Sequence, residues 1–150
     1  YAVGEGRFSR CKRDWVAIHD ATKPWQYPDN SFDLIVALDL FEHIYESDLD
    51  FVIKELYRVA KKWVFLEIAT VDGIKEKGYI LKKGEPIPLV EDGRTWAGHC
   101  TVMTPDDWDE KFDHEDWMSR RDMVNWFFSL LAPLTIPNWL LNTVIVLEGL

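Results

Sequence analysis

The sequence is poor in cysteine and in basic residues. Its two cysteines, Cys11 and Cys100, form no CxxC pair and show no Cys/His spacing typical of a metal site. We therefore expect no metal and a reducing, cytoplasmic location. Lysine and arginine number 17 against 26 acidic residues, which gives a formal net charge of −9. This balance argues against nucleic acid as a partner, because nucleic-acid binding requires a basic face.

Long apolar runs are also missing. No stretch approaches the roughly 18 apolar residues that a membrane-spanning helix needs. Pro133 and Pro137 interrupt the apolar segment 126–150, and no signal peptide is apparent. We therefore expect no membrane partner. Hydrophobic residues nevertheless make up 47% of the 150 residues, enough for the core of a single domain over residues 1–150.

The centre of the chain alternates between strand and helix patterns. Residues 15–19 and 32–38 are short apolar runs that predict strands. The second run is nearly continuous, so we expect it to be buried on both faces, as in a parallel sheet. Residues 47–61 carry an apolar stripe of helical period with Ser47 as a cap, and residues 63–69 predict a further strand. This order is a βαβ unit, which predicts an α/β fold.

The C-terminal half is less regular. Residues 70–104 contain five glycines and two prolines, which predicts a long connection of the kind that often serves as a lid or binding loop. Thr104, followed by proline, is a start signal for a helix over 105–111. An amphipathic pattern predicts a helix over 119–131, and a final run rich in valine and isoleucine predicts a strand over 142–148.

Polar residues follow the predicted strands where each strand ends. Asp20 follows the first, Asp39 to His43 follow the second, and Thr70 follows the third. In open α/β sheets, ligands bind at the carboxyl ends of the strands. The pattern fits a pocket rim and ordinary polar strand ends equally well.

Three segments resemble class I methyltransferases, which use S-adenosylmethionine. HDATKPWQYPDNSFDLIVALDLFEHI resembles the central motifs, VIKELYRVAKKWVFLEIAT the next helix and strand, and MTPDDWDEKF the helix before the last hairpin. The resemblance covers residues 1–117 and is most specific over 19–69. It implies a Rossmann-like three-layer sandwich, with a mostly parallel sheet and an antiparallel C-terminal strand. It also implies methyl transfer to a small-molecule acceptor.

The resemblance implies cofactor contacts at two strand ends. Asp20 would accept a hydrogen bond from the adenine amino group, which a carboxylate can do because it only accepts. The backbone N–H of Ala21 would meet an adenine ring nitrogen, and Leu38 and Asp39 would line the methionine side of the cofactor. Judged on the residues alone, Asp20 is also well explained as a plain turn residue.

The resemblance also implies an acceptor side. Glu42 and His43 would open the helix that follows the second strand, near the methyl-transfer centre, and His99 in the long connection would face the acceptor. Either histidine is a candidate catalytic base, because an imidazole titrates near neutral pH. His43 is equally an ordinary residue at a helix start, and methyl transfer also proceeds by proximity without a base.

The family's glycine-rich turn and acidic ribose-binding strand end have no counterpart in the sequence. Gly4-Glu5-Gly6 is not that turn, because no apolar strand precedes it and only 13 residues separate Gly6 from Asp20. We therefore expect an N-terminally truncated member that lacks the first βαβ unit and exposes an unpaired strand edge. The alternatives are a non-catalytic Rossmann-like interaction module, with a homodimer formed through that edge, and a nicotinamide-dependent oxidoreductase.

Overall fold

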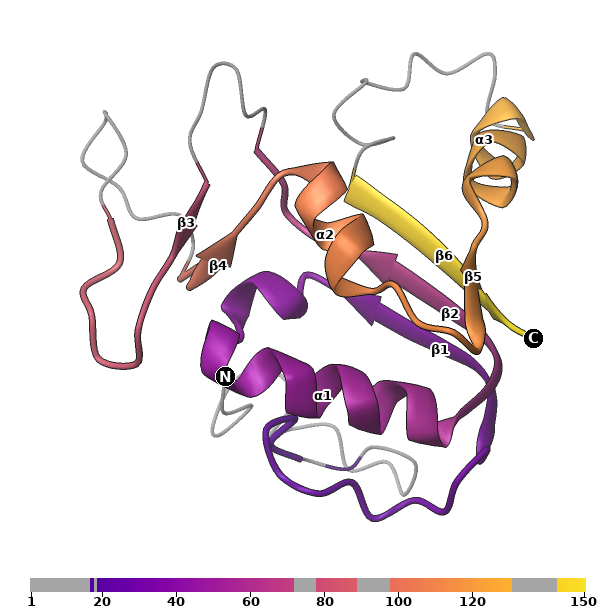
Figure 1. Ribbon diagram of the computed structural model, residues 1–150, viewed down its shortest axis with the longest axis horizontal. Helices are drawn as coiled ribbons and strands as arrows, with labels where there is room; N and C mark the ends of the chain where they lie inside the picture. Colours follow the sequence, from indigo (N-terminus) through magenta and orange to yellow (C-terminus); the bar gives the residue numbers. More distant parts are fainter. Residues whose placement is uncertain (1–16, 18, 72–77, 89–97, 131–142) are drawn as a thin grey trace.

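The computed structural model describes residues 17, 19–71, 78–88, 98–130 and 143–150. Its main sheet has the order β1-β2-β6-β5 (Figure 1). β1 and β2 are parallel, β6 is antiparallel to β2, and β5 is antiparallel to β6. Three of these strands thus run in one direction and β6 runs against them. The strands are β1 (Phe32–Leu38), β2 (Ala60–Glu67), β5 (Trp117–Ser119) and β6 (Val144–Gly149).

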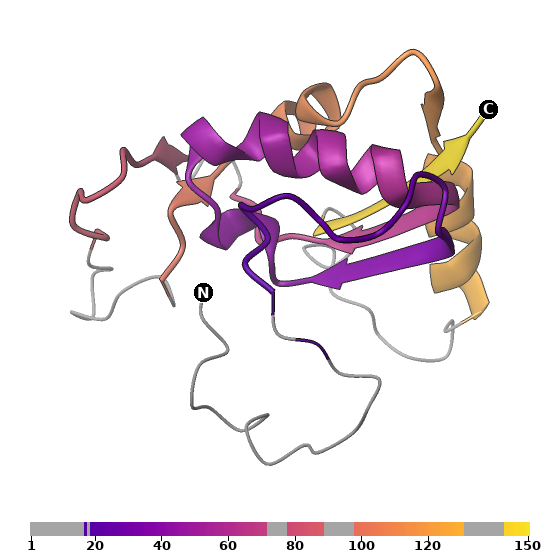
Figure 2. The same cartoon turned by 90° about the horizontal axis from the view of Figure 1, so that it is seen from below.

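Helices lie on both sides of this sheet, and a second, two-stranded sheet lies beside it (Figures 1 and 2). The smaller sheet pairs β3 with β4 in antiparallel fashion. The α/β class and the antiparallel C-terminal strand predicted from the sequence are confirmed. The remaining elements are η2 (Phe41–His43), α1 (Glu46–Val59), β3 (Tyr79–Ile80), β4 (Thr101–Val102), α2 (Pro105–Lys111) and α3 (Arg121–Leu130).

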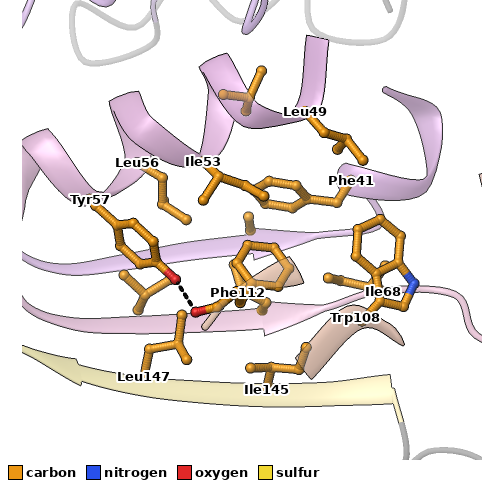
Figure 3. Packing of buried hydrophobic residues seen from close by; sticks show 14 of the residues in the cluster. Phe41, Leu49, Ile53, Leu56, Tyr57, Ile68, Trp108, Phe112, Ile145 and Leu147 are labelled. Atoms are coloured by element: carbon orange, nitrogen blue, oxygen red, sulfur yellow. Dashed lines mark hydrogen bonds between the residues drawn. The ribbon is translucent and has the colours of Figure 1, made fainter. Parts of the chain in front are cut away.

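The alternation of side chains along the strands divides the core into two layers. The layer on the side of α1 and α2 includes buried Val64 and Leu66 from β2, together with Trp108 from α2 (Figure 3). The intervening Phe65 points the other way and packs with Phe128 of α3. This is the period of two that places successive strand residues on opposite faces. No described helix is long and apolar enough to cross a membrane.

The start of α1 differs from the prediction, whereas the start of α2 confirms it. α1 begins at Glu46 after Tyr45 and has no side-chain cap, so the prediction of Ser47 as the cap was wrong. Ser47 lies inside the first turn, where Glu46 and Asp48 complement the helix dipole instead. In α2, the Asp107 N–H donates to Thr104 Oγ1 at 3.2 Å, and the Thr104 N–H donates to Asp107 Oδ2 at 3.2 Å. This is a complete capping box.

β1 is not buried on both faces, contrary to the prediction. Leu34, Val36 and Leu38 are 55%, 53% and 58% exposed, whereas Ala37 is buried toward α1. On their side of the sheet, α3 packs against Phe65 of β2 and Val146 of β6 and leaves these three side chains exposed. Among the described strands, β1 pairs only with β2.

Two other expectations change. Ala17 and His19 lie in no strand, and the remaining residues of the predicted strand 15–19 lie outside the described residues. The connection over 70–104 is not wholly irregular, because β3 and β4 pair within it, with Tyr79 opposite Val102. Such short pairs carry too few residues to show a period in the sequence.

Candidate functional site

Asp39 turns the chain sharply at the carboxyl end of β1. Its φ is +49°, in the left-handed region that few residues other than glycine and asparagine adopt readily. Its N–H donates to the carbonyl of Glu67 at 3.0 Å, which ties the end of β1 to the end of β2. The turn brings η2 directly over the ends of both parallel strands.

Three carboxyl groups gather at these strand ends. Glu42 is fully buried, and its Oε1 accepts a hydrogen bond from the Ala69 N–H at 3.0 Å, while its Oε2 has no partner among the described residues. Burial raises the pKa of Glu42. Burial also raises the pKa of Glu67, as do the negative charge of Asp39 and a hydrogen bond with its carboxyl group. Glu42 and Glu67 therefore retain their protons more readily than isolated glutamates would.

Two histidines face each other beside this cluster. The rings of His43 and His99 have centroids 4.9 Å apart and planes at 75°. The His43 Nδ1 lies 3.2 Å from the Gly98 carbonyl, and because a carbonyl only accepts, this nitrogen carries a proton. Burial lowers the pKa of His99, and the positive charge of His43 lowers it further. His99 Nδ1 is buried and has no partner in the described part of the chain. Burial and the charge of His43 therefore favour the neutral form of His99, and the negative charge of Asp39 opposes them.

Hydrogen bonds fix the histidine-bearing segment against η2. The Cys100 N–H donates to the Glu42 carbonyl at 2.7 Å, and Thr101 Oγ1 donates to the Ile44 carbonyl at 2.7 Å. Tyr79 Oη donates to the His99 carbonyl at 3.2 Å from the neighbouring strand. Because these bonds bridge two distant parts of the sequence, the spacing of the two histidine rings is built into the fold.

Asp20 and Ala21 lie in a separate turn. The Thr22 N–H and Oγ1 donate to Asp20 Oδ1 at 2.9 and 2.8 Å, and these bonds lower the pKa of Asp20, which is exposed. The Ala21 carbonyl accepts from Trp25 Nε1 at 3.0 Å. The described hydrogen bonds of Asp20 and Ala21 thus all stay within residues 20–25, and none reaches Asp39.

The segment after this turn is tied to α1 by Glu55 and Arg58. The Trp25 N–H donates to Glu55 Oε2 at 2.8 Å, and Arg58 donates to the carbonyls of Trp25 and Tyr27 at 3.0 and 2.8 Å. Arg58 also pairs with Asp29 at 2.8 Å. The Arg58 guanidinium lowers the pKa of Glu55 to about 2. The proline-rich segment therefore has a defined path along the helix, and the turn at Asp20 is anchored next to it.

The structure thus brings together Asp39, His43 and His99, and Leu38 adjoins Asp39 in the chain. The described hydrogen bonds of Asp20 and Ala21 connect them with none of these residues. Sequence reasoning missed Glu67, although it ends the second parallel strand and the strand-end argument applies to it as well. Among the described residues, no group of three or more histidine, cysteine or acidic side chains could hold a metal ion.

One family model matches the part of the chain that contains β1, η2 and α1. Residues 6–66 match a family model described as a methyltransferase domain. The resemblance predicted from the motifs is confirmed over these residues, which are fewer than half of the chain but include β1, η2, α1 and nearly all of β2.

Other comparisons are more distant. No curated protein matches the chain. Among solved structures, the crystal structure of the [4+2]-cyclase SpnF is similar, with 14% identity and a TM-score of 0.47. The alignment covers 89% of this chain and 54% of that one, so the chain spans about half the length of that structure.

Proposed function

We propose that this chain carries part of a site for S-adenosylmethionine-dependent methyl transfer to a small-molecule acceptor. The observation that supports this most is the coincidence of two features. The segment that matches a methyltransferase domain ends at β2, and Asp39, Glu42 and His43 gather at the carboxyl ends of β1 and β2 within that segment. In an open α/β sheet this edge is where ligands bind. The buried Cys100 is a free thiol, which suits a reducing, cytoplasmic setting.

The residues present suit the cofactor. Both Thr22 hydrogen bonds go to Oδ1 of Asp20, which leaves Oδ2 available as an acceptor for the adenine amino group. The backbone N–H of Ala21 adjoins this group and would meet an adenine ring nitrogen. Leu38 offers an apolar surface that is 58% exposed, and Asp39 offers negative charge beside it. Negative charge at this end suits the cationic sulfonium and ammonium groups of the methionine part.

The histidine pair would serve the acceptor. S-adenosylmethionine supplies, when bound, an electrophilic methyl group. Burial favours the neutral form of His99, whose ring would accept a proton from an acceptor hydroxyl or amine. His43 orients the His99 ring through their edge-to-face contact and is itself fixed by Gly98. The negative charge of Asp39 disfavours an anionic acceptor, because like charges repel in a partly buried site.

Equilibrium dialysis with labelled S-adenosylmethionine tests the proposal. We expect Asp20→Ala to weaken binding about 10- to 100-fold, the usual effect of losing a hydrogen bond to a charged group. Asp33→Asn is the matched control, because Asp33 is exposed on β1 and pairs with Lys61 at 3.5 Å, away from the strand ends. No measurable binding to the wild-type chain, or equal binding by both variants, would refute the cofactor assignment.

A second function is favoured by the face of β1 that stays exposed in the described structure. Leu34, Val36 and Leu38 present an apolar strip there, which on soluble proteins often marks an interaction site. A non-catalytic interaction module would form a homodimer through this face, with Leu38 at the contact and no role for Asp20, His43 or His99. Sedimentation of wild-type chain and of Val36→Lys separates the two functions, because only the dimer is lost through this substitution.

A further inference from the structure

A second depression lies away from the strand-end site. It is a groove of about 720 Å³ lined by residues of α2, of the first turn of α1 and of the β3–β4 pair. Figure 1 shows where these elements lie. This volume is in the range of sites that bind small molecules. None of the residues proposed to hold the cofactor or the acceptor lines it. The lining consists of Glu46, Gly78, Tyr79, Ile80, Val102, Met103, Thr104, Asp107, Glu110 and Lys111.

The floor of the groove is apolar and tightly built. Val102 and Met103 are buried, and Ile80 is half exposed beside them. Gly78 approaches so closely that a Cβ at this position would lie 2.5 Å from the Val102 carbonyl oxygen. Only glycine fits there without moving a strand, so the close approach of the two chain segments depends on it. The floor therefore offers a rigid apolar surface to the hydrocarbon part of a ligand.

The rim of the groove carries unbalanced negative charge. Lys111 is the only cation among the described residues that line the groove, and it pairs with Asp50 at 2.8 Å. Asp107 is engaged with the Thr104 hydroxyl at 2.6 Å. Glu46 and Glu110 are exposed and take part in no ion pair among the described residues. Because both line the groove, an ammonium group bound there would be attracted by their negative charges.

An aromatic wall adds to this preference for a cation. Tyr79 is half buried in the groove, and its hydroxyl is held by the His99 carbonyl at 3.2 Å, so the ring has a fixed position. The face of a tyrosine ring attracts ammonium groups within about 6 Å of its centre. The carboxylates on the rim and the Tyr79 ring in the wall thus both favour a positively charged ligand.

We propose that this groove binds an organic cation, an ammonium group on an apolar body. The apolar body lies against Ile80 above the buried Val102 and Met103, and the ammonium group lies at the rim that carries Glu46 and Glu110. Anions of the same size are repelled. The site is independent of the methyl-transfer proposal, because its occupant contacts neither Asp39 nor the histidine pair.

Titration of the 15N-labelled chain with 2-phenylethylamine tests the proposal, with 2-phenylethanol and 3-phenylpropionate as the neutral and anionic counterparts. We expect the amine to shift the backbone amides of Tyr79, Ile80 and Glu110, and to bind more tightly than the alcohol. The acid should bind most weakly. Added salt should weaken the amine alone, because it screens exposed charges.

Substitution of the two carboxylates supplies the decisive comparison. The double variant Glu46→Gln with Glu110→Gln should bind the amine about fivefold more weakly, since each exposed ion pair contributes well under 1 kcal/mol, and should bind the alcohol unchanged. Glu115→Gln, an exposed residue outside the groove, should leave both affinities unchanged. Equal affinity for amine and alcohol, shifts elsewhere in the chain, or an unaltered amine affinity in the double variant would overturn the assignment. Dialysis with S-adenosylmethionine should give the same result for the double variant and wild type.

Discussion

Replacing Tyr57 with phenylalanine tests how α2 is held against α1. Tyr57 Oη is buried and donates to the Phe112 carbonyl at the end of α2 at 2.6 Å (Figure 3). The ring itself stacks on Trp117 with centroids 5.1 Å apart, a contact that phenylalanine retains. The variant therefore loses the hydrogen bond alone and leaves a buried carbonyl without its donor. This removes about 1–2 kcal/mol from the free energy of unfolding.

For a domain of this size, that loss corresponds to a fall of about 3 to 6 °C in the melting temperature. Urea unfolding followed by circular dichroism measures the free energy, and calorimetry measures the temperature. Tyr27→Phe is the matched control, because Tyr27 is 43% exposed and packs edge-on against Phe32. It should stay within about 0.5 kcal/mol of wild type. A Tyr57→Phe variant as stable as this control would show that the bond does not hold α2 in place.

Three further predictions concern the site and the core. Thr101→Val leaves the Ile44 carbonyl without its buried donor, so urea unfolding should show a loss of about 1–3 kcal/mol; an unchanged free energy would contradict the anchoring role of Thr101. Leu56→Ala opens a cavity in a fully buried position and should cost about 2–5 kcal/mol by the same assay, whereas exposed Leu130→Ala should cost little. Glu42 has a raised pKa, so the folded state binds more protons than the unfolded state between the ordinary glutamate pKa and the folded one, and wild-type stability falls as pH rises through that window. Glu42→Gln should remove this fall, so that its stability relative to wild type increases with pH; a difference that stays constant with pH would refute the assignment.

The elements with long-range periodicity could be predicted from the sequence. The apolar stripe of α1 and the run of β1 are long enough to show their period, and Thr104 with Pro105 marks the start of α2 by local chemistry alone. The position of Ser47 could not be judged in this way, because the helix begins one residue before it. Whether a strand is covered on both faces depends on its neighbours, and for β1 no property of Phe32–Leu38 reveals that.

The site was predictable in part for the same reason. Strand ends converge in any parallel sheet, so Asp39 and His43 could be assigned to one edge from order alone. The contact between His43 and His99 could not be predicted, because it depends on hydrogen bonds from Cys100 and Thr101 across more than 50 residues. Glu42 Oε2 lacks a hydrogen-bond partner among the described residues because the side chain is buried, and burial is not visible in the sequence. Acidic residues are too common for the sequence to single out Glu42.

Burial favours the uncharged form of both the carboxyl groups and the histidine at the strand ends. It raises the pKa of Glu42 and Glu67 and lowers that of His99, so in each case it favours the neutral form. A neutral imidazole can take a proton, and a carboxyl group that shares one with Asp39 can give or hold one. In the proposed methyl transfer, His99 would become an imidazolium beside His43 when it accepts a proton from a hydroxyl or amine. Burial and the charge of His43 favour the neutral ring before that step, whereas the negative charge of Asp39 favours the protonated ring that would follow it.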